Sequence, residues 1–253
     1  MNAAVATRSR WLRRFHQADD AAVRLICFPH AGGAAGFYFP MSRALSPYVD
    51  VHAVQYPGRQ DRRSEPGSVD IDELADGIVG ALAPILDGGP LAFFGHSMGA
   101  VLAYETARRL ERRAGFSPVV LFASGRRAPS RRREENVHLR GDRALLEELR
   151  QLGGTAPELL DDHEVMQALL PAIRRDYQAI ETYRHRPGTE PSCPIAVLTG
   201  DDDPRTTLDE ARDWKHHTTG GCTLHVIPGS HFFLSEHTQD VAALITARLL
   251  VGP

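Results

Sequence analysis

Short apolar runs alternate with longer amphipathic segments along most of this chain. Each of six runs is four to six residues long and nearly continuously apolar, as expected for strands that helices cover on both faces. They are Val23–Phe28, Val49–Val54, Leu91–Phe94, Val119–Ala123, Ile195–Thr199 and Thr223–Ile227. The helix-length segments between them are Ile71–Leu86, Met98–Arg113, Leu208–His217 and Thr238–Leu250. The alternation predicts an α/β protein with a mostly parallel sheet and helices on both faces.

One interval, from Gly125 to Pro191, contains no strand pattern. Apolar residues recur there every three or four positions, which places them on one face of a helix. They are Val165, Leu169, Ile173, Tyr177 and Ile180. Pro171 interrupts this pattern, and we expect a kink or two short helices. We predict that residues 126–190 form a helical lid within a single domain of residues 1–253, and that the first four of these apolar residues line a substrate pocket. The alternative is that the helices only pack on the sheet edge.

Composition excludes several classes of protein. The 253 residues are 42% hydrophobic and 24% charged, close to the globular average, which excludes a disordered or fibrous chain. No apolar run approaches the roughly 18 residues of a membrane span, so we expect no integral membrane protein. The net charge of −3 argues against general nucleic-acid binding.

The cysteines and the first residues bear on the cellular compartment. Cys27, Cys193 and Cys222 are odd in number and lack CxxC spacing, which fits a reducing cytoplasm better than a secreted disulfide scaffold. Four arginines between Arg8 and Arg14, with no acidic residue nearby, also suit a transit peptide. Because the segment lacks the apolar core of a secretory signal, we expect an ordinary N-terminus and a cytoplasmic protein.

The stretch Gly95-His96-Ser97-Met98-Gly99 joins an apolar run to an amphipathic segment. A nucleophile elbow has this setting, with a serine at a sharp turn between a strand and a helix. Side chains two residues before and after the serine would collide in such a turn, and glycine at both places removes the collision. We therefore predict that Ser97 is a nucleophile; the alternative is a tight turn whose serine caps the helix.

A serine nucleophile needs a base, and a carboxylate must orient that base. In this architecture the three residues follow one another as Ser, Asp and His, on loops at the carboxyl ends of strands. His231 occupies the loop after the last predicted strand, which makes it the candidate base. His225 falls inside that strand and His237 near the last helix, where we expect surface or packing roles.

Three successive aspartates follow the preceding strand, Asp201, Asp202 and Asp203. Asp203 lies furthest from the strand and beside Pro204, which restricts the turn. Asp201 and Asp202 are expected to cap the following helix or to face solvent. Position alone therefore favours Asp203 without separating the three firmly.

A loop of small residues follows the first strong strand, in Phe28-Pro29-His30-Ala31-Gly32-Gly33. Such residues let backbone N–H groups approach a ligand. An oxyanion hole takes one donor from this loop and one from the residue after the nucleophile. The donors would be the N–H groups of Ala31 and Met98. The loop lacks both glycine patterns of phosphate-binding loops, which excludes that alternative.

Together these motifs resemble the type II thioesterases that accompany polyketide synthases and nonribosomal peptide synthetases. The matching stretches, spread over nearly the whole chain, are Phe28-Pro29-His30-Ala31-Gly32-Gly33, Tyr56-Pro57-Gly58-Arg59, Gly95-His96-Ser97-Met98-Gly99-Ala100, Ser124-Gly125-Arg126-Arg127-Ala128-Pro129, Gly200-x-x-Asp203-Pro204 and Pro228-Gly229-x-His231-Phe232-Phe233. G-H-S-M-G alone occurs in many hydrolases, but its combination with P-H-A-G-G, Y-P-G-R and G-x-H-F-F is much more specific. Ser230 stands where the family usually has glycine.

The resemblance implies an α/β-hydrolase fold with a helical lid and a triad of Ser97, Asp203 and His231. Its G-x-x-D-P match selects Asp203, and it also implies Ala31 and Met98 as oxyanion donors. The implied activity is hydrolysis of acyl groups stalled on the phosphopantetheine arm of acyl or peptidyl carrier proteins. That reaction requires no metal and no organic cofactor.

Alternatives to this function stay open. A small-molecule esterase or an acyltransferase of the same fold would carry the same triad, whereas a hydrolase-fold binding protein would turn over negligibly. We expect a monomer that binds neither nucleic acid nor membrane and that meets carrier proteins through an arginine-rich loop, unless that loop is only a solvated surface. Its arginines are Arg126, Arg127, Arg131, Arg132 and Arg133. The acidic residues around His163 are expected to cap a helix rather than to bind metal.

Overall fold

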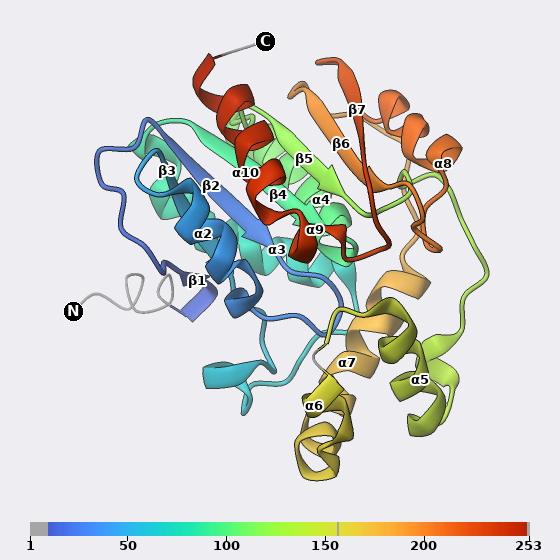
Figure 1. Ribbon diagram of the computed structural model, residues 1–253. Coiled ribbons are helices and arrows are strands. Elements are labelled where there is room, and N and C mark those ends of the chain that lie inside the picture. Colours follow the sequence, from blue (N-terminus) through green and yellow to red (C-terminus); the bar gives the residue numbers. More distant parts are fainter. Residues whose placement is uncertain (1–9, 156, 252–253) are drawn as a thin grey trace.

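A single twisted sheet forms the centre of the computed structural model, which describes residues 10–155 and 157–251 (Figure 1). Its strand order is β1-β3-β2-β4-β5-β6-β7, and every neighbouring pair is parallel except β1 with β3. The strands are β1 (Leu12–Arg13), β2 (Val23–Phe28), β3 (Val49–Val54), β4 (Leu91–His96), β5 (Leu121–Ser124), β6 (Ile195–Gly200) and β7 (Cys222–Ile227). The prediction of an α/β fold with a mostly parallel sheet is therefore confirmed.

The six predicted strands all form, two of them with the predicted bounds. Strands β2 to β6 consist almost wholly of buried residues, because helices cover both faces of the sheet. Strand β5 begins two residues later than predicted, at Leu121. The two-residue strand β1 was not predicted, since its only signal is Leu12 beside arginines.

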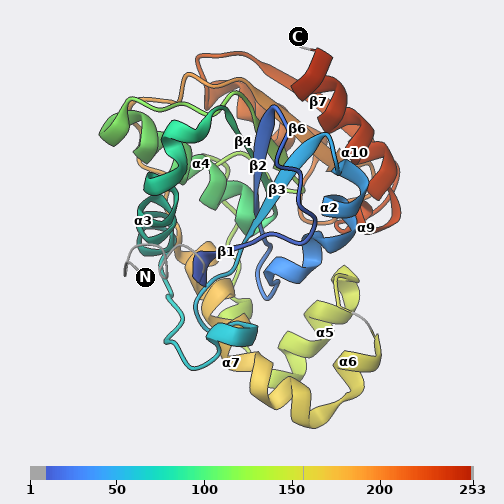
Figure 2. The ribbon, with the colours of Figure 1, turned by 90° about the vertical axis from the view of Figure 1, so that its left-hand side faces the viewer.

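Helices pack in two layers, one on each face of the sheet (Figure 2). One layer contains α3 (Ile71–Leu82), α4 (Met98–Ala114) and α8 (Leu208–Arg212), whose apolar residues share one core cluster. The other contains α2 (Phe39–Leu45), α9 (Phe233–Glu236) and α10 (Thr238–Thr246), which share a second cluster. Short 3-10 segments are η1 (Ala35–Tyr38) before α2, η2 (Gln60–Arg62) between β3 and α3, η3 (Ala83–Gly88) after α3 and η5 (Asp213–His216) after α8. The π-type segment η6 (Ala247–Val251) follows α10.

Three predicted helices change type before their predicted ends. Helix α3 stops at Leu82 because Pro84, two residues on, has no N–H to continue the ladder. Helix α8 gives way to η5 and α10 to the π-type segment η6. Helix α2 was not predicted; its sequence carries Pro40 in its first turn, where proline is tolerated.

The segment between β5 and β6 contains η4 (Val137–Leu139), α5 (Asp142–Leu152), α6 (Pro157–Asp161) and α7 (His163–Thr182). In Figures 1 and 2 these helices lie together beyond the carboxyl ends of the strands. They share their own hydrophobic cluster, which includes Leu145, Leu149, Leu170 and Tyr177. As predicted, an acidic residue near His163 caps a helix: the side chain of Asp162 accepts the Val165 N–H at the start of α7.

Helix α7 continues through Pro171 as one helix, so of the kink or two short helices that we expected, the two short helices do not form. Proline removes one hydrogen bond of the ladder. The helix persists because Leu170, Ile173 and Tyr177, on both sides of the proline, are buried in the cluster that α7 shares with α5.

No helix within residues 10–155 and 157–251 is long and apolar enough to cross a membrane. The prediction of an ordinary N-terminus concerns the arginine-rich segment at the start of the chain. Its first nine residues, including Arg8, lie outside the described part of the chain.

Candidate active site

Ser97 lies at the sharp turn between β4 and α4. Its backbone has φ 54° and ψ −117°, a strained conformation for a residue other than glycine. A Cβ on Gly95 would lie 2.1 Å from the carbonyl oxygen of Gly99, and a Cβ on Gly99 would lie 1.9 Å from that of Phe28. Both glycines are therefore required by close backbone contacts, and the turn presents the Ser97 side chain at the end of the sheet.

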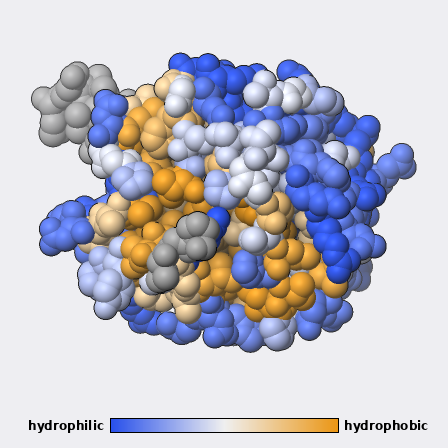
Figure 3. Space-filling view, turned by 90° about the horizontal axis from the view of Figure 1, so that it is seen from above, coloured by the Kyte–Doolittle hydropathy of each residue, from blue (hydrophilic) through white to orange (hydrophobic). Residues whose placement is uncertain are grey.

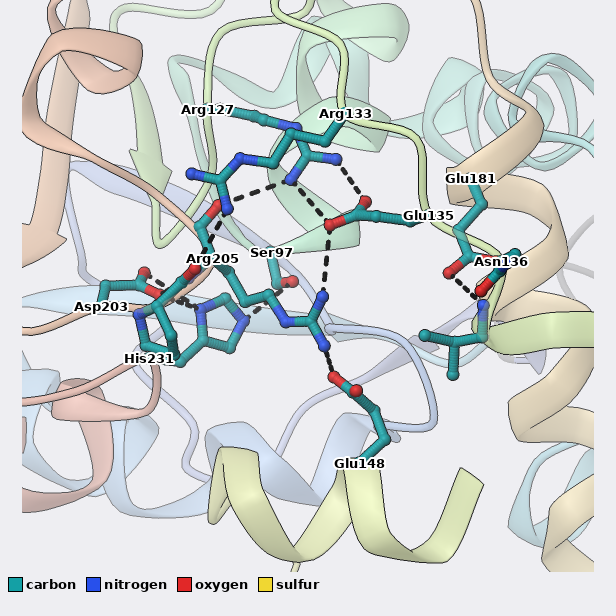
Figure 4. Close-up of polar contacts among 12 residues, drawn as sticks. Ser97, Arg127, Arg133, Glu135, Asn136, Glu148, Glu181, Asp203, Arg205 and His231 are labelled. Carbon is teal, nitrogen blue, oxygen red and sulfur yellow. Dashed lines mark hydrogen bonds and ion pairs between the residues drawn. The ribbon is translucent and has the colours of Figure 1, made fainter. Parts of the chain in front are cut away.

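Ser97, His231 and Asp203 form one line of hydrogen-bonding groups (Figure 4). The Oγ of Ser97 lies 3.1 Å from Nε2 of His231. Nδ1 of His231 lies 3.0 Å from both carboxylate oxygens of Asp203. The Asp203 side chain is fully buried, and one of its oxygens also accepts the Arg205 N–H at 2.8 Å. The residues come from three loops, each following a different strand of the sheet.

The other two aspartates of this loop have different surroundings. Asp201 accepts the Gly229 N–H at 2.8 Å and so links the loops after β6 and β7. Asp202 is exposed. Neither caps α8, because Thr207 does so through a reciprocal capping box with Glu210. Asp201 and Asp202 are both exposed, so of the two roles expected for them, solvent exposure holds and helix capping does not.

Two further histidines lie beside the three residues. The ring of His96 lies 5.2 Å from that of His231 between centroids, and its Nδ1 lies 2.9 Å from Ser124 Oγ. Burial lowers the pKa of His96 far below its usual value and that of His30 to about 3. Both imidazoles are therefore neutral at physiological pH. By contrast, His225 is only half-buried within β7, and His237 pairs with Asp240 on the surface.

The loop after β2 carries the two glycines of the predicted oxyanion loop. The Gly32 N–H donates to the Asp176 carboxylate at 2.7 Å, and the Gly33 N–H donates to the His30 carbonyl at 2.9 Å. Within the described residues, the N–H groups of Ala31 and Met98 have no protein acceptor. Met98 begins α4, so its N–H also lies at the positive end of the helix dipole.

A buried ion pair supports this loop from the side of α7. Asp176 pairs with Arg59, and their side chains are only 5% and 4% exposed. Arg59 belongs to the Tyr56-Pro57-Gly58-Arg59 motif, whose purpose was not apparent from the sequence. Burial raises the pKa of Asp176 even though Arg59 opposes that shift. The pair thus links the loops after β2 and β3 to helix α7.

A cavity opens beside Ser97 and His231, and its empty space together with the solvent at its mouth is about 700 Å³. Ile173 and Tyr177 line it as predicted, together with Leu149 and Ile180, so its wall combines α5 and α7. Val165 and Leu169 do not line it, and Leu169 is 37% exposed. On α7 the buried residue before Ile173 is Leu170, three positions earlier, and the next is Met166. The prediction placed the buried residue four positions before Ile173, at Leu169.

Charged residues form a network of ion pairs beside Ser97 and His231 (Figure 4). Arg127 pairs with Glu135, and Arg205 pairs with both Glu135 and Glu148 of α5. Arg126 lines this cavity and also a neighbouring one of about 340 Å³. Its side chain has no ion-pair or hydrogen-bond partner among the described residues. Burial, followed by the charge of Arg127, lowers the pKa of Arg126 to about 9. The sequence identified the arginine-rich loop but not this glutamate network, because the glutamates lie in separate segments.

Comparison with known proteins agrees with this geometry. The family model for the thioesterase domain matches residues 23–249. A probable cadicidin biosynthesis thioesterase of Streptomyces griseus is 52% identical over 243 residues, 96% of this chain and 67% of that protein. Thioesterase PikA5 of Streptomyces venezuelae is 48% identical over 241 residues, 95% of this chain and 86% of that protein. The type II thioesterase BorB from the borrelidin biosynthetic cluster has a solved structure with a TM-score of 0.86 and 52% identity, over 94% of this chain and 97% of that one.

Proposed function

The chain belongs to the thioesterase domain family, and from that premise we propose that it is a type II thioesterase of a polyketide or nonribosomal peptide pathway. It hydrolyses acyl groups from the phosphopantetheine arm of acyl or peptidyl carrier proteins. The alignment of Ser97, His231 and Asp203 beside a largely apolar cavity is the observation that carries this proposal. No metal or organic cofactor takes part in the proposed reaction.

In the acylation step, Ser97 attacks the thioester carbonyl while His231 accepts the hydroxyl proton. Asp203 holds the Nδ1–H of His231 and stabilises the imidazolium that forms. The tetrahedral intermediate then collapses, the C–S bond breaks and the pantetheine sulfur leaves, taking the proton from His231. This leaves an acyl ester on Ser97.

Ala31 and Met98 serve as the oxyanion donors in this proposal. Their N–H groups have no acceptor among the described residues, Met98 directly follows Ser97, and Ala31 lines the same cavity as Ser97. Each such donor contributes about 3–4 kcal/mol in comparable enzymes. In the second step His231 takes a proton from water as the water oxygen attacks the ester. The carboxylic acid leaves, and His231 returns the proton to the Ser97 oxygen.

We propose that the chain forms one domain and that residues 126–190 act as its lid. Support comes from the position of α5, α6 and α7 beyond the carboxyl ends of the strands and from the cavity wall that α5 and α7 provide (Figure 2). The acyl chain lies against Ile173 and Tyr177. Movement of these helices would change access to Ser97.

The triad assignment is tested by turnover of an acyl carrier protein. Ser97→Ala should abolish hydrolysis with the fold retained, and Asp203→Asn should lower kcat by up to about 10⁴-fold, because the imidazole loses its orienting charge. The matched control is Asp202→Asn, which changes an exposed carboxylate in the same loop. Wild-type turnover in Ser97→Ala, or equal losses in the two aspartate variants, would contradict the assignment.

The arginine-rich loop is the proposed docking surface for the carrier protein. Arg131 and Arg133 are already paired with Asp213 and Glu210, so Arg132, exposed and without a partner among the described residues, is the residue to change. Arg132→Ser should raise KM for the acyl carrier protein and weaken its salt dependence, since rim charges tune association. Hydrolysis of a short thioester without the carrier should not change. Arg112→Ser, at the far end of α4, is the control.

A small-molecule esterase or an acyltransferase of the same fold is the second candidate. The same triad and cavity would serve either of them. Comparing kcat/KM for an acyl carrier protein with that for a free ester, and adding an alcohol or thiol acceptor, separates the three activities. A binding protein without turnover would leave Ser97 unlabelled by a sulfonyl fluoride.

Location and assembly stay predictions. We propose a cytoplasmic monomer, which cell fractionation and light scattering would test. The face of the molecule opposite α5 to α7 carries a broad area of hydrophobic residues framed by hydrophilic ones (Figure 3). If scattering shows a dimer instead, this face is the first place to look for its interface.

A further inference from the structure

Outside the catalytic cavity, four polar side chains from three segments converge on one point. Tyr104 lies on α4, His185 and Glu190 lie in the strap of residues 183–194 between α7 and β6, and His217 follows η5. Single donor atoms of His185, Glu190 and His217 all lie within 4.8 Å of one another. His217 is buried, and the side chains of His185 and Glu190 are only 9% and 19% exposed.

Four of the six distances among these donor groups are close to those around a four-coordinate metal ion. Zinc bonds of about 2.0–2.2 Å at tetrahedral angles place ligand atoms about 3.3–3.5 Å apart. The Tyr104 hydroxyl lies 3.1 Å from His185 Nε2 and 3.4 Å from His217 Nδ1. The Glu190 carboxylate lies 3.7 Å from His185 Nε2 and 3.8 Å from His217 Nδ1. Coordination would also separate the Tyr104 and Glu190 oxygens, which share a short hydrogen bond, and would draw together donor atoms that lie up to 4.8 Å apart.

Hydrogen bonding outside the cluster leaves the required lone pair on His217. Its Nε2 lies 2.8 Å from the Oγ of Ser130, which can accept the Nε2–H. Nδ1 then carries a lone pair and faces Tyr104 and Glu190, two oxygens that share a hydrogen bond of their own. Metal-bound histidines commonly have their second nitrogen held in this way. A cation at the centre would satisfy all of these lone pairs together.

A cation beside the cluster already has partners of its own. The nearby cation Arg108 is paired with Glu105 and donates to the Arg186 carbonyl, so it holds the strap in place.

We propose that these side chains bind one zinc ion through His185 Nε2, His217 Nδ1, the Glu190 carboxylate and the Tyr104 oxygen. Two imidazoles with a carboxylate are a donor set that zinc favours, and four protein ligands make a closed, structural site. The ion replaces the hydrogen bond between Tyr104 and Glu190. It joins α4, the strap that follows the lid and the turn after η5. This proposal does not depend on the catalytic assignment, which involves none of these residues.

The direct test is the zinc content of the purified full-length protein after removal of metal and titration with zinc chloride. We expect one zinc per chain in the wild type and none in His185→Ala or Glu190→Gln. The control is His237→Ala, which changes a surface histidine paired with Asp240 and should retain one zinc. Cobalt should replace zinc and show the visible absorption of a four-coordinate complex.

Two further measurements keep the proposal testable if a ligand variant folds poorly. Ser130→Ala removes the hydroxyl that hydrogen-bonds the outer nitrogen of His217, and it should weaken zinc binding about 10- to 100-fold. A chelator should lower Tm of the wild type and leave that of Glu190→Gln unchanged. A wild-type chain that binds no zinc, or zinc that survives both ligand substitutions, overturns the proposal and leaves a hydrogen-bonded cluster without metal.

Discussion

Replacing Asp176 would test how the proposed oxyanion loop is held in place. The Asp176 carboxylate accepts the Gly32 N–H at 2.7 Å and pairs with Arg59, and both side chains are at least 95% buried. Asp176→Ala removes the acceptor of Gly32 and leaves the Arg59 guanidinium buried without its partner. Asp176→Asn keeps an oxygen for Gly32 and removes only the charge.

The expected loss of stability follows from the burial of the pair. Breaking a buried ion pair by removing one partner costs about 3–5 kcal/mol, which already includes most of the lost hydrogen bond to Gly32. At about 2–4 °C per kcal/mol for a chain of this size, Asp176→Ala should lower Tm by about 6–20 °C. The control is Asp161→Ala: Asp161 pairs with Arg150 on the surface, their side chains are 74% and 45% exposed, and the cost should stay below about 1 kcal/mol.

Activity provides the second measurement. Ala31 lies next to Gly32, so releasing the Gly32 N–H should displace the Ala31 donor. We expect kcat of folded Asp176→Ala to fall, by less than the roughly 100- to 1,000-fold that loss of a whole donor costs, with KM almost unchanged. Asp176→Asn should recover part of kcat. A boronic acid that forms a tetrahedral adduct on Ser97 should lose affinity in parallel with kcat/KM.

Two results would refute this reasoning. If Asp176→Ala and Asp161→Ala lower Tm equally, the buried pair does not stabilise the fold. If kcat and boronic acid affinity stay at wild-type values in a folded Asp176→Ala protein, the pair does not position the oxyanion loop.

Three further predictions concern the elbow, the cavity and pH. Gly99→Ala should abolish activity or folding, because its Cβ would lie 1.9 Å from a backbone oxygen. The control Gly80→Ala, whose Cβ would have nothing within 4 Å, should raise Tm slightly. Equal Tm values for the two variants in thermal melts would contradict the close-contact argument. Ile173→Ala should shift the acyl profile toward bulkier groups, and exposed Leu169→Ala should not; matching profiles would place the acyl chain elsewhere. Stability should fall as pH drops below about 6.5, by at most about 1.4 kcal/mol per pH unit for each buried histidine. The sign follows because the pKa of His30 falls to about 3 on folding, so the unfolded chain binds protons that the folded chain does not. Urea melts at pH 7.5 and 5.5 with equal midpoints would contradict it.

Much of the fold could be predicted from the sequence because its signals are local. Strands β2 and β3 have the predicted bounds, since a run of apolar residues with both faces buried has few other ways to fold. The elbow around Ser97 was predictable for the same reason: the clash that Gly95 and Gly99 avoid lies within the turn and its neighbouring strand. The order of the loops placed His231 and favoured Asp203 before any contact was known.

Which face of α7 is buried could not be predicted from the spacing of its apolar residues. Val165 and Leu169 satisfy helical spacing as well as Met166 and Leu170 do, and only the docking of α7 against α5 decides which pair is buried. Pro171 likewise predicts a kink or two short helices, and tertiary packing keeps α7 as one helix.

Contacts between distant segments were decided by the tertiary structure alone. Asp176 is 144 positions from Gly32 and 117 from Arg59, and no pattern in the sequence pairs them. Tyr104, His185 and His217 meet because α4, the strap and the turn after η5 pack together. The tendency of an apolar run to become buried depends on its own residues, so it can be predicted from the sequence. The pairing of single polar groups depends on how whole segments dock, which the free energy of the complete fold determines.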